Sequence, residues 1–211
     1  MIINNNLIGI CIIILLLIFY YNAPIKEYFT TNSTISEFDN RPYKVVGGFS
    51  DKNIAADKLA KLNEFIIQFL KYIKINVINN SNQPLEKQQF FMRILNNYNI
   101  DNIFENEPDP GAVTSFVANK GLQFGICLRK KGEMENQFHE IDILKFVMLH
   151  ELTHLGCISY GHDNEFWNYF KVVLSEAVKS GLYTPIDYSK NPENYCGISV
   201  SNNPHCNANK C

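Results

Sequence analysis

The chain has 211 residues, of which 46% are hydrophobic and 13% aromatic, so it is long enough to form one compact domain with a packed core. Its formal net charge is −2, so the chain carries no excess of the basic side chains that direct a protein to nucleic acid. This composition argues against a disordered chain and gives no reason to expect direct nucleic-acid binding.

The first 25 residues contain no charged side chain, and Leu7–Tyr21 is almost wholly apolar. With the neighbouring Ile2, Ile3 and Ala23, this run is slightly short for a membrane span, which needs roughly 20 apolar residues. We therefore predict a transmembrane anchor over residues 1–25. The alternatives are a cleaved signal peptide, although no basic residue precedes the apolar run, and a buried core helix.

The charges that follow the apolar run bear on orientation. Lys26, Arg41 and Lys44 all lie on its C-terminal side. Positive residues are enriched on the cytoplasmic side of membrane spans. The sequence thus predicts a single-pass membrane protein with its domain on the cytoplasmic side.

After the anchor, residues 26–50 are polar and are interrupted by Pro42 and Gly47–Gly48, so we expect a linker. A domain over residues 51–190 follows. Its first helix is indicated by apolar residues at positions 55, 59, 62, 66, 69 and 73, and a second helix fits Leu85–Tyr98.

The second half of the domain begins with a predicted β-hairpin. Its strands are Val113–Ala118 and Leu122–Arg129, joined by the turn sequence NKG. A third helix is expected over Asp142–Ile158, and a fourth from about Asp163 to Gly181. The order of helices, hairpin and helices indicates an α+β fold. Residues 191–211, rich in Cys and Asn, are expected to form an irregular tail.

The six cysteines form no metal-binding pattern, because no CxxC spacing occurs. Cys127 and Cys157 lie in apolar stretches, where a buried free thiol is the ordinary interpretation. Cys196, Cys206 and Cys211 cluster in the tail, where an oxidising compartment would permit a disulfide.

The third predicted helix carries the sequence HELTH at residues 150–154. His150 and His154 are four residues apart, so on a helix they project from one face and can reach the same zinc ion. Glu151 is rotated by about 100° from His150, so it can contact an activated water without being a ligand. This spacing predicts a zinc-dependent hydrolase with Glu151 as general base.

The third zinc ligand has several candidates. His162 follows His154 by eight residues, just after Gly161, which can turn the chain back. We expect His162 to complete the site and Asp163 to cap the fourth helix. Glu176, on the fourth helix, is the main rival as third ligand, and Asp163 or His205 is a further alternative. Phe166, Trp167 and Phe170 are interpreted as core anchors of the fourth helix.

The segment from about Val113 to Gly181 resembles the WLM family of zinc metalloproteases, which is related to SprT-like enzymes. The resemblance rests on VANKGLQFGICLR, ILKFVMLHELTH and GHDNEFW. It implies a small zincin-like domain, one zinc ion bound by His150, His154 and His162, and Glu151 as catalytic acid and base. It also implies that the strand before the active-site helix, here Leu122–Arg129, aligns the substrate peptide as an added strand. The third histidine of the family usually follows the second by six residues, whereas here the separation is eight.

The predicted anchor and tail lie outside the core family pattern and are similar to those of hypothetical proteins of large DNA viruses. Some family members digest proteins crosslinked to DNA, but a net charge of −2 gives no support for that substrate here.

The leading hypothesis is a membrane-anchored zinc metallopeptidase, more specifically an endopeptidase, whose partner is a polypeptide substrate. One alternative is a catalytically inactive, zinc-stabilised interaction domain at a membrane surface, which would not need Glu151. The other is a protease of DNA-bound proteins. The sequence leaves the substrate and the oligomeric state undefined.

Overall fold

The structure is a computed structural model, and it describes residues 31–107, 114–131, 137–206 and 211. The described residues include a five-stranded sheet with the strand order β1-β2-β3-β5-β4. The strands are β1 (Thr31–Ile35), β2 (Pro42–Val46), β3 (Ile103–Glu105), β4 (Phe116–Ala118) and β5 (Gln123–Ile126). The pairs β1–β2 and β4–β5 are antiparallel, whereas β2–β3 and β3–β5 are parallel. The short strand β4 therefore lies at one edge of the sheet.

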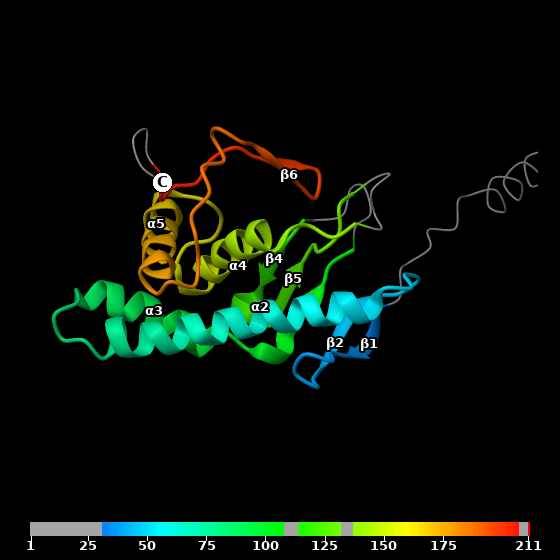
Figure 1. Cartoon of the computed structure of the whole chain (residues 1–211). Helices are drawn as coiled ribbons and strands as arrows, with labels where there is room; N and C mark the ends of the chain where they lie inside the picture. Colours follow the sequence, from blue (N-terminus) through cyan, green and yellow to red (C-terminus); the bar gives the residue numbers. More distant parts are fainter. Residues whose placement is uncertain (1–30, 108–113, 132–136, 207–210) are drawn as a thin grey trace, which may run out of the picture.

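Helices pack against this sheet and against one another. They are α2 (Lys52–Ile73), extended by the π-helical turn Lys74–Ile78, then α3 (Leu85–Asn97), α4 (Ile141–Gly156) and α5 (Asn164–Lys179). Helix α2 runs along strands β1, β2 and β3, while α4 contacts β4 and is flanked by α3 and α5 (Figure 1). Short 3-10 turns, Ile100–Asn102 and Asn119–Gly121, precede β3 and connect β4 to β5. The four predicted helices, the hairpin and the α+β class are confirmed.

The stretch expected to be a linker supplies two strands of the sheet. In β2, Pro42 and Lys44 are exposed, whereas Tyr43, Val45 and Val46 are buried. This alternation buries one face of the strand against α2. It is only a few residues long and is bordered by Pro and Gly, so it resembles a linker when the sequence is read alone.

The C-terminal tail also differs from the irregular segment that was expected. It forms a small antiparallel hairpin of β6 (Glu193–Tyr195) and β7 (Ile198–Val200). A disulfide between Cys127 and Cys196 ties this hairpin to the end of β5, so the expectation of a free thiol at Cys127 is wrong. Two of the three tail cysteines, Cys206 and Cys211, form a second disulfide. Cys157 is buried and free, as predicted.

The predicted localisation as a single-pass membrane protein requires correction. Within the described ranges, no helix is long and apolar enough to cross a membrane. Residues 1–25, on which the anchor was placed, lie outside those ranges.

A buried ion-pair network joins the sheet to the start of α2. Arg129, which is 1% exposed, pairs through Nε with Glu105 Oε1 at 2.8 Å and through Nη2 with Asp51 Oδ1 at 2.7 Å. The other oxygen of Glu105 accepts a hydrogen bond from the backbone N–H of Val46 at 2.8 Å. The network thus connects β2, β3 and the residue preceding α2 around a guanidinium whose side chain is fully buried.

Removing Glu105 from this network should be strongly destabilising, because the buried Arg129 guanidinium would lose its fully buried counter-charge and keep only the partly exposed Asp51. We expect Glu105→Ala to lower the free energy of unfolding by about 3–5 kcal/mol, measured by urea denaturation. The control is Asp101→Ala, which removes the exposed partner of Arg41. This substitution should change the free energy of unfolding by at most about 1 kcal/mol. Equal effects of the two substitutions would contradict this account.

Candidate metal centre and active site

Helix α4 is a core helix that carries two histidines into a pocket. Apolar side chains cover most of its circumference, and those buried are Ile143, Leu144, Phe146, Val147, Met148, Leu149, Leu152 and Leu155. His150 and His154 lie one turn apart on the remaining, half-buried face. Burial on so many sides fixes the helix, and the two imidazoles with it.

Three side chains hold the C-terminal end of α4. Arg93 Nε donates to the carbonyl of Gly156 at 2.6 Å, and Asn97 Nδ2 donates to that of Leu155 at 3.0 Å. Lys120 Nζ donates to the carbonyl of Cys157 at 2.7 Å. These bonds satisfy carbonyls that a helix end leaves without intrahelical partners, so α4 stops at a defined position.

The loop between α4 and α5 brings the third histidine back to the helix. The carboxylate of Glu165 accepts hydrogen bonds from the backbone N–H of Ile158 at 3.0 Å and of Ser159 at 2.9 Å. Gly161 has φ +85°, a turn conformation that favours glycine. Asp163 Oδ1 accepts from the N–H of Phe166 at 3.0 Å, so Asp163 is the N-cap of α5, as predicted. The eight-residue separation is accommodated entirely in this loop.

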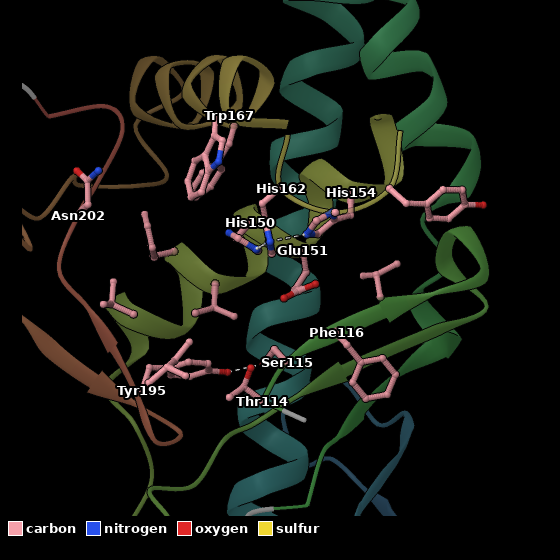
Figure 2. Close-up of a pocket in the computed structure, with 18 of the residues that line it drawn as sticks. Thr114, Ser115, Phe116, His150, Glu151, His154, His162, Trp167, Tyr195 and Asn202 are labelled. Carbon is pink, nitrogen blue, oxygen red and sulfur yellow. Dashed lines mark hydrogen bonds between the residues drawn. The ribbon is translucent and has the colours of Figure 1, made fainter. Parts of the chain in front are cut away.

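The three imidazoles converge through their Nε2 atoms. Nε2 of His162 lies 2.8 Å from that of His150 and 3.2 Å from that of His154. All three candidate ligand atoms lie within 4.8 Å of one another. Nitrogens bound at 2.0–2.1 Å to one tetrahedral zinc ion are separated by about 3.3 Å, so the arrangement fits a zinc site. Figure 2 shows the three rings meeting at one side of the pocket.

The environment keeps these rings neutral. Burial, followed by the neighbouring His154 and His162, lowers the pKa of His150 to about 3. Burial and then His162 lower the pKa of His154 to about 4, and burial also lowers the pKa of His162. A neutral imidazole has a free lone pair, so at pH 7 all three are able to bind a metal ion.

Glu151 lies beside the histidines and next to the edge strand (Figure 2). Its side chain is 6% exposed, and burial raises its pKa to about 8, opposed by a hydrogen bond from the backbone of Val117 in β4. A cation held by the histidines would favour the carboxylate form. Burial thus raises the proton affinity of this carboxyl group, and a cation bound by the histidines would lower it again.

The structure places the rival ligands elsewhere. Glu176 is 3% exposed and pairs with Lys87 and Lys179, each at 2.8 Å. Asp163 is used as the helix cap described above, and His205 lies in the tail after Pro204. Among the described residues, the group of His, Cys, Asp and Glu side chains close enough to hold a metal ion consists of His150, His154 and His162.

A pocket of 530 Å³ opens beside the histidines. Its walls come from β4 and the turn after it, from α4, from the loop before α5, from α5 and from the C-terminal tail. Trp167 is 46% exposed and lines this pocket, so it is not a buried core anchor, whereas Phe166 and Phe170, with which it was grouped, are buried. The contribution of the tail carries no sequence signal, because residues 198–202 have neither a motif nor a clear periodicity.

Among the described strands, β4 and not β5 lies at the edge of the sheet next to the pocket. Strand β5, within the segment expected to align the peptide, is hydrogen-bonded to β3 on one side and to β4 on the other. Phe116 and Val117 of β4 line the pocket, and the backbone N–H of Val117 donates a hydrogen bond to Glu151. The expectation that Leu122–Arg129 adds a peptide strand is therefore contradicted, because an added strand needs a sheet edge and, among the described strands, β4 lies at that edge.

Comparisons with known proteins place the chain in a family. The WLM domain matches residues 87–208. The chain is 29% identical over 193 residues to "Uncharacterized protein R325" of Acanthamoeba polyphaga mimivirus, covering 92% of this chain and 93% of the relative. It is 34% identical over 106 residues to "Uncharacterized protein 136R" of Invertebrate iridescent virus 6, covering 50% of this chain and 56% of the relative.

Two solved structures are also similar. A crystal structure of a Wss1 mutant from Saccharomyces cerevisiae aligns with a TM-score of 0.47 and 20% identity, covering 66% of this chain and 92% of that one. A second crystal structure of Wss1 from Saccharomyces cerevisiae aligns with a TM-score of 0.46 and 19% identity, covering 65% of this chain and 89% of that one. Because the WLM match spans more than half of its residues, the chain belongs to the WLM domain family.

Proposed function

We propose that the chain is a zinc-dependent metallopeptidase, in which His150, His154 and His162 bind one zinc ion and Glu151 is the general base. The observation that carries this proposal is the convergence of three neutral imidazoles beside a buried carboxylate, at a pocket bordered by a free strand edge. Its partner would be a polypeptide substrate.

The number of ligands favours catalysis over a structural role. Structural zinc sites are usually closed by four protein ligands, whereas catalytic sites have three and an open position. In the part of the chain that the structure describes, no fourth His, Cys, Asp or Glu joins the three histidines. The open side faces the pocket, where a substrate carbonyl could enter.

The residues of the chain then have distinct tasks in peptide hydrolysis. When bound, zinc would acidify a water molecule and polarise the substrate carbonyl. Glu151 would take a proton from the attacking water and donate it to the amine nitrogen as the C–N bond breaks. The N–H of Val117 holds the Glu151 carboxylate in place, and the backbone of β4 would orient the peptide.

Zinc content tests the ligand set. We expect one zinc ion per chain in the purified protein, determined by elemental analysis, and loss of most of it in His162→Ala, because two imidazoles bind zinc weakly. Glu176→Gln should retain the metal, because Glu176 pairs with lysines away from the site. If His162→Ala retains zinc and Glu176→Gln loses it, the third zinc ligand is Glu176 and not His162.

Turnover tests the role of the carboxylate. Glu151→Gln should lower kcat against denatured casein by about 10²–10⁴-fold while zinc content is unchanged, because the amide cannot accept the proton. The matched control is Glu37→Gln, at an exposed position, which should leave kcat unaltered. A zinc-loaded parent that cleaves no polypeptide would instead favour a zinc-stabilised interaction domain.

A further inference from the structure

The segment from Ile198 to Asn202, here named the C-terminal strap, is held at both ends. On one side, Cys196 is bound to Cys127 by a disulfide. On the other, Asn203 is 1% exposed and its Nδ2 donates to Tyr183 Oη at 3.1 Å and to the carbonyl of Ile186 at 3.0 Å. The strap is therefore fixed by its flanking residues, although it contributes little to the core itself.

The strap forms one wall of the pocket described above. All five of its residues line that pocket, and Figure 2 shows Asn202 on the side of the pocket away from Phe116 of β4. The same pocket is lined by Phe146 and Val147 of α4 and by Trp167 and Phe170 of α5. These helices and the strap thus enclose the part of the pocket that lies away from β4.

This part of the pocket is apolar and begins directly at the histidines. The ring of Phe170 lies 5.1 Å from that of His150, and the ring of Phe146 lies 5.3 Å from that of Phe170. Val147 and the strap residue Val200 add aliphatic surface. A side chain that follows this wall would exchange water for apolar contacts immediately beside the scissile bond.

The charged side chains that line the pocket do not belong to its apolar part. Among the described residues that line the pocket, the acidic and basic side chains other than the neutral histidines are Lys120 and Glu151. Lys120 is bonded to the carbonyl of Cys157 and its ammonium lies 4.5 Å from the centre of the Tyr160 ring. The polar groups that the strap contributes, from Ser199, Ser201 and Asn202, are all neutral. A charged substrate side chain would lose hydration there without finding a counter-charge.

We propose that the strap turns this part of the pocket into a specificity subsite for a large, uncharged apolar side chain adjacent to the scissile bond, such as Leu or Phe. This inference rests on the proposed peptidase function, because it names the substrate class of the same site. It assigns to the tail a direct role in substrate selection.

Cleavage of a matched peptide series tests the selectivity. The probes are acetylated, amidated nonapeptides of Gly and Ser with Leu, Phe, Ala, Lys or Glu at the central position. We expect kcat/KM for the Leu and Phe peptides to exceed that for the Ala, Lys and Glu peptides by about tenfold or more. Equal values for all five peptides would overturn the proposal.

The single tryptophan of the sequence gives a readout that does not require catalysis. Because Trp167 is half-exposed and lines the subsite, its fluorescence should shift when the Leu or Phe peptide binds to the zinc-loaded Glu151→Gln protein, and not with the Lys or Glu peptide. A selective shift without turnover in the parent would refute the peptidase function and support the subsite. If the parent cleaves all five peptides equally well and the fluorescence does not shift, the peptidase function is supported and the subsite is refuted.

A charge placed on the strap should change the preference. Asn202→Asp alters one exposed, nearly isosteric side chain and should raise kcat/KM for the Lys peptide relative to the Leu peptide by about two- to fivefold, as for a partly solvated ion pair. Asn53→Asp adds the same charge at an exposed position on α2 and should leave the ratio unchanged. An identical ratio in both variants would contradict the assignment of the strap.

Discussion

The site depends on one interaction, the binding of the 157–163 loop by the carboxylate of Glu165. Two histidines on one helix are placed by the helix itself, but the third must return across eight residues of chain. Glu165 accepts hydrogen bonds from two successive backbone amides at the start of that loop and lies in the first turn of α5. It thereby couples the end of α4 to the beginning of α5, and His162 is positioned between them.

Around this centre, the fold uses segments that are distant in sequence. Strand β4 provides a free edge and the amide that contacts Glu151, while the Arg129 network fixes the sheet against α2. The tail closes the opposite side of the pocket, fastened by the Cys127–Cys196 disulfide. The pocket thus lies between the sheet edge and the C-terminal segment, with α4 as its floor. Its two sides differ in chemistry, because the β4 side presents backbone groups, whereas the strap side combines apolar side chains with neutral polar groups.

The elements that sequence predicted well are those with a strong local signal. The helical periodicities and the HELTH spacing depend on neighbours within a few residues, so α2 to α5 and the positions of His150, Glu151 and His154 could be read directly. The position of His162 could not be decided in this way. Its separation from His154 is accommodated by a loop whose shape depends on Glu165 and Gly161, and no periodic pattern encodes such a turn.

The features that were missed depend on long-range contacts. Strands β1 and β2 are short and bordered by Pro and Gly, and they exist because α2 covers one face of them. The pairing of Cys127 with Cys196 spans 69 residues, and six cysteines allow too many pairings for sequence to choose among them. The edge position of β4 likewise follows from the strand order, which periodicity does not reveal.

X-ray absorption at the zinc edge of the purified protein tests the central claim most directly, because it reports the atoms around the metal. The account predicts a four-coordinate ion with three imidazole nitrogens at about 2.0–2.1 Å and one oxygen from solvent. Bound zinc with sulfur ligands, or with four ligands that all come from the protein, would contradict an open catalytic centre at His150, His154 and His162.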